Sequence, residues 1–94
     1  MRFEWDPRKA KDNLRKHRVS FEEAITVFRD PLAVIFDDED HSVNERREII
    51  VGHSVGNRLL LVCFAENEKE NVRIFSTREL ARRERKNYEE RKSS

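Results

Sequence analysis

"REIIVGHSVGNRLLLVCFA", residues 47–65, contains two short apolar runs joined by a polar turn, and this stretch decides the fold. The runs at 47–53 and 58–65 are rich in β-branched and large aliphatic residues, which favours strands over helices. Gly56 and Asn57, between the runs, are typical of a tight hairpin turn. The two runs are therefore predicted to pair as antiparallel strands, and the rest of the chain must complete their sheet.

Two similar runs flank this hairpin: "LAVIF" at 32–36 precedes it, and "VRIFS" at 72–76 follows it after the polar loop "ENEKEN". Strands that follow one another through short loops pair with their neighbours. The sequence therefore predicts a four-stranded antiparallel meander and, together with the helices described next, an α+β fold.

Two short helices are predicted before the sheet. Asp6 is a suitable N-cap and Pro7 suits the first helical position, with His17 at the end of this first helix. Ser20 and Glu23 have the spacing of a capping box and start a second helix, which Asp30-Pro31 stops. Each helix is amphipathic, so both are expected to pack their apolar sides on the sheet.

A last helix is predicted to begin directly after the fourth strand, because Ser76 and Glu79 repeat the capping-box spacing. At a helical period, one side of this helix packs on the sheet, and an arginine stripe lies roughly 110° away from that side. The packing side comprises Leu80, Ala81, Glu84 and Tyr88, and the stripe comprises Arg78, Arg82 and Arg85.

Size and composition restrict the class of protein. The chain has 94 residues, enough for one domain, placed here at 1–91 with a disordered tail at 92–94. Lys plus Arg number 20 against 19 Asp plus Glu, and such a neutral balance gives little non-specific affinity for DNA. No run has the length of a membrane span and no signal peptide is evident, so a cytoplasmic protein is expected. A single cysteine, Cys63, excludes an internal disulfide and a cysteine-based zinc site.

The arginine stripe has two interpretations. A guanidinium can donate two parallel hydrogen bonds to a phosphate, so arginines spaced along a helix can follow a nucleic-acid backbone. Alternatively, Glu79, Glu84, Glu89 and Glu90 pair with these arginines on a solvated surface. The sequence leaves both open, although Arg73 on the preceding strand is expected near the same end of the fold.

The acidic loop "DDEDHSVNE", residues 37–45, is the second candidate site. Its spacing matches no calcium loop, so metal binding is disfavoured. Histidine is the side chain that exchanges protons near neutral pH, so His41 is a candidate acid or base, with Glu45 orienting it or working beside it. A plain polar loop between strands remains the alternative.

Three blocks of this sequence together resemble the BrnT toxins of bacterial type II toxin-antitoxin pairs. They are "WDPRKAKDNLRKHRVSFEEAITVFRDP" (5–31), "DHSVNERREIIVGHS" (40–54) and "VRIFSTRELARRERKNYEE" (72–90), in order through nearly the whole chain. The resemblance implies a RelE-like fold and a ribonuclease that blocks translation until a BrnA antitoxin neutralises it. It also implies that the antitoxin carries a ribbon-helix-helix DNA-binding part, so the toxin would reach operator DNA only through the antitoxin. Arg18 stands where many relatives have glycine, at an expected left-handed turn.

The resulting hypothesis is metal-independent cleavage of an RNA substrate, without a cofactor or a membrane. Such cleavage needs a base for the 2′-hydroxyl, an acid for the leaving oxygen and cations for the phosphate. The candidate catalytic residues are His41, Glu45, Arg78 and Arg82, and the candidate phosphate-binding residues are Arg47, Arg73, Arg83 and Arg85. The alternative is a non-catalytic RNA- or protein-binding module that uses the basic C-terminal helix.

Overall fold

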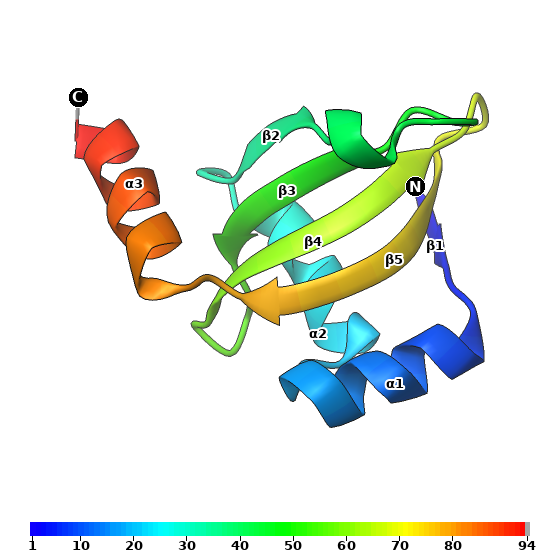
Figure 1. Cartoon of the computed structure of the whole chain (residues 1–94), viewed down its shortest axis with the longest axis horizontal. Coiled ribbons are helices and arrows are strands. Elements are labelled where there is room, and N and C mark those ends of the chain that lie inside the picture. The colour runs from blue at the N-terminus through cyan, green and yellow to red at the C-terminus, as the bar shows by residue number, and fades with distance from the viewer. Residues whose placement is uncertain (94) are drawn as a thin grey trace.

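A computed structural model describes residues 1–93, and within them the chain forms a five-stranded sheet and three α-helices (Figure 1). The strand order is β1-β5-β4-β3-β2. Neighbouring strands are antiparallel except β1 and β5, which are parallel. The strands are β1 (Arg2–Glu4), β2 (Val34–Asp37), β3 (Glu48–His53), β4 (Leu59–Glu66) and β5 (Asn71–Glu79).

The predicted hairpin is confirmed as β3 and β4. Ile50 lies opposite Val62 and Gly52 opposite Leu60, so the two apolar runs face each other along their length. In the turn, the Ser54 N–H donates to the Arg58 carbonyl at 2.9 Å, and Asn57 takes a left-handed backbone with φ 61. An asparagine tolerates this conformation better than most residues, as the turn prediction assumed.

The α+β class is confirmed, but the four-stranded antiparallel meander is wrong in detail. β1 adds a fifth strand, parallel to β5, with Phe3 opposite Val72. A segment of three residues is too short to show a period, and its partner is nearly the whole chain away. Phe3 instead acts through tertiary packing, since its ring centroid lies 5.1 Å from that of Phe28.

The two N-terminal helices begin where their caps predict. α1 (Pro7–His17) starts after Asp6, whose Oδ1 accepts the Arg8 N–H at 2.8 Å. α2 (Phe21–Thr26) starts after Ser20, whose Oγ accepts the Glu23 N–H at 3.0 Å, and it ends in a 3-10 turn, Val27–Arg29. Between the helices, Arg18 makes the expected left-handed turn with φ 60, although it is not a glycine.

One face of the sheet is covered by α1, α2 and the 3-10 turn, and the main core lies there. Trp5 packs edge-on to Phe21 at 5.8 Å between centroids, and Phe28 packs on Phe64 at 5.0 Å. Each large side chain buried in this way contributes about 1.5–3 kcal/mol. The buried core residues are Val19, Phe21, Ala24, Val27, Ile50, Leu60, Val62, Phe64, Val72 and Ile74.

A buried asparagine joins α1 to the sheet. The Asn13 side chain donates to the carbonyls of Val19 and Thr77 at 3.0 and 2.9 Å, and its Oδ1 accepts the Thr77 N–H at 3.0 Å. Three hydrogen bonds satisfy all but one of the bonding positions of the side-chain amide. Asn13 therefore holds the middle of β5 against the N-terminal layer.

The prediction that the last helix begins at Ser76 is wrong. β5 continues to Glu79, with Arg78 opposite Leu61 in the ladder, and α3 spans Arg82–Ser93. Glu84 caps the start of this helix, because its carboxylate accepts the Ala81 N–H at 2.8 Å. This hydrogen bond is the reverse half of a capping box. The tail predicted at 92–94 thus overlaps the end of α3, and residue 94 lies outside the described residues.

α3 leaves the end of β5 and stands apart from α1 and α2 (Figure 1). Among residues 82–91 of this helix, Tyr88 alone is buried. No helix within residues 1–93 has the length and apolar content needed to cross a bilayer.

Candidate functional site

The face of the sheet opposite α1 and α2, here called the second face, carries the candidate site. Because successive side chains of a strand alternate between faces, the neighbours of the core residues Ile50 and Val62 project from this second face. The ladder places Ile49, Cys63 and Ser76 in one row across three strands, and Val51, Leu61 and Arg78 in the next.

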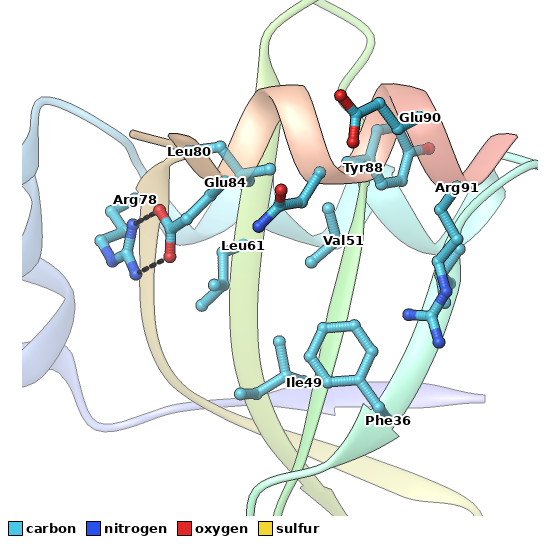
Figure 2. Close-up of a pocket in the computed structure, with 12 residues that line it drawn as sticks. Phe36, Ile49, Val51, Leu61, Arg78, Leu80, Glu84, Tyr88, Glu90 and Arg91 are labelled. Carbon is cyan, nitrogen blue, oxygen red and sulfur yellow. Dashed lines mark hydrogen bonds and ion pairs between the residues drawn. The ribbon is translucent and has the colours of Figure 1, made fainter. Parts of the chain in front are cut away.

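A groove of about 720 Å³ lies between the second face and α3, and we call it the α3 groove (Figure 2). Tyr88 closes it from the helix side, and its hydroxyl donates to the Leu32 carbonyl at 3.3 Å. Leu80, just before the helix, also lines it. The sheet contributes the apolar side chains of Val34, Phe36, Ile49, Val51 and Leu61.

Arg78 borders this groove and is held by Glu84 in a forked ion pair, as Figure 2 shows. The two nitrogen-to-oxygen distances are 2.7 and 2.8 Å. The hydrogen bonds to Arg78, followed by the one from the Ala81 N–H, lower the pKa of Glu84 to about 2, and the same pair raises the pKa of Arg78. A phosphate must therefore compete with Glu84 for this guanidinium.

A second group of cations gathers around Phe75, and we call Lys9, Arg47, Arg73 and Phe75 the Phe75 cluster. The guanidinium carbon of Arg47 lies 3.9 Å from the ring centroid, Lys9 Nζ lies 5.3 Å away and Arg73 5.9 Å away. Phe75 sits at a β-bulge, because Ser76 pairs with Cys63 and Ile74 with Phe64, which leaves Phe75 as the extra residue. Cation–π attraction helps to hold these charges together.

Arg47 is the most constrained of these cations. Its side chain is 30% exposed, and Nε is buried with no hydrogen-bond partner among the described residues. The nearest carboxylate oxygen, of Glu45, is 4.0 Å from Nε. A buried donor without a partner is costly, so this position of Arg47 needs an explanation.

A histidine–aspartate pair lies on the loop that is fastened to Arg47. His41 Nδ1 lies 3.0 Å from both carboxylate oxygens of Asp38, which is buried, whereas the His41 side chain is 66% exposed. The Asp38 N–H donates to the Arg47 carbonyl at 2.9 Å, and the Arg47 N–H donates to Ser42 Oγ at 3.0 Å. An Nδ1–H held by Asp38 leaves Nε2 as the nitrogen that can exchange a proton with a substrate.

Cys63 lies in the middle of the second face, in one row with Ile49 and Ser76. Burial raises the pKa of its thiol, the hydrogen bond to Ser76 lowers it, and smaller effects come from the charges of Asp38, Arg78 and Arg47. Three charged groups from three segments thus act on one central side chain.

The structure brings together only part of the predicted site. Arg47 and Arg73 meet at Phe75, His41 lies on the loop bonded to Arg47, and Arg78 lies on the same face. The stripe of Arg78, Arg82 and Arg85 on one helix does not exist, because Arg78 belongs to β5.

The remaining predicted residues lie elsewhere or act differently. Asp38, rather than Glu45, contacts His41. Arg85 lies 3.7 Å from Glu89 on the exposed side of α3, a contact of the kind that the surface-pairing alternative predicts. Arg82 and Arg83 are exposed at the start of α3 and do not line the α3 groove.

Sequence reasoning missed Asp38, Lys9, Phe75 and the α3 groove. One signal was present for the groove: the unbroken apolar runs "IIV" and "LLLV" make both faces of the sheet apolar, which is typical of a sheet covered on both sides. Phe75 gave no such signal, because its position depends on the bulge.

Comparison with known proteins gives a family and a fold. Residues 5–84 match the family described as "Ribonuclease toxin, BrnT, of type II toxin-antitoxin system". A search of curated proteins found no match. Among solved structures, the 1.1 Å crystal structure of the Brucella abortus ribonuclease toxin BrnT matches with a TM-score of 0.67 and 21% identity. The match covers 87% of this chain and 99% of that one, and at this identity it shows a shared fold.

Proposed function

Because the chain belongs to the BrnT family of ribonuclease toxins of type II toxin-antitoxin systems, we propose that it cleaves RNA without a metal ion at the second face of its sheet. The observation that carries this proposal is the Asp38–His41 pair beside Arg47. It combines a proton-exchanging group, a carboxylate that orients it and an anion-binding guanidinium.

The reaction that these groups fit is attack by a ribose 2′-oxygen on the adjacent phosphorus. The bond from the 2′-oxygen to phosphorus forms as the bond to the 5′-oxygen breaks. Glu45 takes the proton of the 2′-hydroxyl, and Nε2 of protonated His41 gives a proton to the leaving 5′-oxygen. Asp38 stabilises the imidazolium, and general acid–base catalysis of this kind contributes about 10²–10⁴-fold in rate.

The arginines stabilise the negative charge that grows on the phosphate. Arg47 Nε lies 4.0 Å from a carboxylate oxygen of Glu45, and the Arg47 backbone is bonded to the loop that carries His41, so Arg47 is the cation that we assign to the scissile phosphate. Arg78 joins Arg47 once Glu84 releases it. The exposed Arg82, Arg83 and Arg85 of α3 contact more distant phosphates of the RNA.

The test compares two neighbouring aspartates. Asp38→Asn should slow RNA cleavage by part of the roughly 10²–10⁴-fold that acid–base catalysis contributes, because the imidazole loses the carboxylate that orients it. His41→Ala should reduce the rate of RNA cleavage by a larger factor than Asp38→Asn. On an RNA whose leaving 5′-oxygen is replaced by sulfur, which needs no acid, both variants should approach the wild-type rate, whereas Glu45→Gln should stay slow.

Asp37→Asn is the matched control, because Asp37 is an exposed partner of Arg46 and does not contact His41. It should cleave as the wild type does. Equal rates for Asp38→Asn and Asp37→Asn would refute the role of the pair. RNA that is bound but not cut by the wild type would favour the non-catalytic binding module.

A type II system supplies an antitoxin, and we propose a BrnA-like protein with a ribbon-helix-helix part as this partner. The chain then inhibits translation when it is free and reaches operator DNA only within the complex. Co-purification with such a protein, and loss of RNA cleavage when it is added, would support this. Full cleavage in a stable complex would contradict it.

A further inference from the structure

The Phe75 cluster contains more positive charge than one scissile phosphate requires. Arg47, Arg73 and Lys9 all lie within 5.9 Å of one ring centroid and come from three different segments of the chain. Like charges so close together repel each other, and the π face of one ring offsets only part of that repulsion.

Acidic side chains do not neutralise the cluster. Among the described residues, the one ion pair made by any of its three cations is the 4.0 Å contact of Arg47 with Glu45. Glu4 lies opposite Arg73 in the ladder between β1 and β5 but makes no ion pair with it in residues 1–93. This arrangement contrasts with Arg78, Arg58 and Arg46, each of which has a carboxylate within hydrogen-bond distance.

The three cations of the Phe75 cluster differ in solvent exposure. Arg47 is half-buried against the ring, next to the Asp38–His41 loop, whereas Lys9 and Arg73 are exposed. Lys9 and Arg73 therefore lie on the solvent side of the cluster, next to the proposed scissile position rather than in it.

We propose that Lys9 and Arg73 form a second phosphate subsite, which binds a neighbouring phosphodiester of the same RNA strand. The proposal rests on the proposed function, since Arg47 defines the first phosphate. It assigns Lys9 of α1 a role in binding RNA and none in proton transfer. Such a subsite contributes affinity by charge, so its loss must appear in the salt dependence of binding.

The test uses the full chain and a short single-stranded 2′-O-methyl RNA, which cannot be cleaved because its 2′-hydroxyl is blocked. Binding is measured by fluorescence anisotropy over a series of KCl concentrations. Each phosphate neutralised on a single strand contributes about 0.7 to the slope of log K against log salt. Because Lys9 and Arg73 share one phosphate, Lys9→Gln and Arg73→Gln should each reduce the slope by up to about 0.7.

Two controls separate this effect from damage to the fold. Lys9→Arg keeps the charge and should keep the slope. Lys11→Gln removes an exposed cation from the same helix, away from Phe75, and should leave the slope unchanged. Thermal unfolding of each variant should match that of the wild type.

The subsite would be overturned if Lys9→Gln gave the same slope as the wild type and Lys11→Gln. It would also be overturned if the wild type did not bind the oligonucleotide. Failure of the proposed function gives a different result. In that case the wild type leaves unmodified RNA intact. The salt-dependence slopes of Lys9→Gln and Arg73→Gln are still reduced, and the subsite stands.

Discussion

At the scale of single residues, the most consequential buried polar side chain is Asn13. It supplies three hydrogen bonds to the backbone of Val19 and Thr77, and Thr77 lies one residue before Arg78. A buried backbone group without a partner costs about 1–3 kcal/mol. Asn13 therefore stabilises the fold and positions the part of β5 that carries the candidate site.

Asn13→Ala should lower the free energy of unfolding by about 2–4 kcal/mol, because it leaves two carbonyls and one N–H without partners. Urea denaturation followed by circular dichroism measures this. Asn44→Ala changes the same residue type at an exposed loop position and should lie within about 0.5 kcal/mol of the wild type. A similar small change for Asn13→Ala would show that water replaces these bonds.

At the scale of elements, the contacts that attach α3 include the buried Tyr88 ring and the Arg78–Glu84 pair at the start of the helix. Glu84 also accepts the Ala81 N–H, so one carboxylate fixes both the first turn of the helix and the position of Arg78. The attachment of α3 should therefore depend on the charge of Glu84.

Acid should weaken this attachment in a defined pH window. The pKa of Glu84 is about 2 in the fold against an ordinary 4.5, so its contribution is complete above about pH 4.5 and is lost as the pH falls toward 2. Because both side chains are more than a third exposed, the contribution is at most about 1 kcal/mol. The protection of the α3 amides, taken as hydrogen exchange relative to the intrinsic rate at each pH, should fall across this window in the wild type.

Glu84→Gln should show lower protection of the α3 amides already at neutral pH, and this protection should change much less on acidification than that of the wild type. Glu89→Gln alters an exposed carboxylate of the same helix and should behave as the wild type does. Equal protection of α3 in Glu84→Gln and the wild type would mean that the Arg78–Glu84 pair does not fix the helix.

Elements with local signals were predictable from the sequence. The caps at Asp6 and Ser20 and the turn at Gly56-Asn57 act within a few residues, and the structure confirms them. The start of α3 was not predictable, because the signal at Ser76 is overridden by Asn13, which is distant in the sequence and holds Thr77 in the sheet. β1 was missed for the same reason, since its pairing is non-local.

For the candidate site, the sequence proposed His41, Arg47 and Arg73 among its candidates, and their roles stay predictions. The partner of His41 was mistaken, because a 3-10 turn brings Asp38, three residues earlier, onto Nδ1. The cluster around Phe75 depends on a bulge and on α1 reaching the sheet, and neither leaves a pattern in the sequence.

At the scale of the whole molecule, the two faces of one sheet have different tasks. The first face, under α1 and α2, contains the main core. The second face carries the Asp38–His41 pair, the cations around Phe75 and the α3 groove. A stable first face allows the second to hold several cations close together, which would destabilise a domain without such a core.

The central claim is that the protein cleaves RNA without a metal ion by attack of the 2′-hydroxyl, and the chemistry of the RNA ends tests it most directly. Purified protein is incubated with RNA in EDTA, and the ends of the products are identified. Attack by the 2′-hydroxyl predicts 2′,3′-cyclic phosphate and 5′-hydroxyl ends, formed by the wild type and lost in His41→Ala. Products with 3′-hydroxyl and 5′-phosphate ends, or cleavage that EDTA abolishes, would contradict the account.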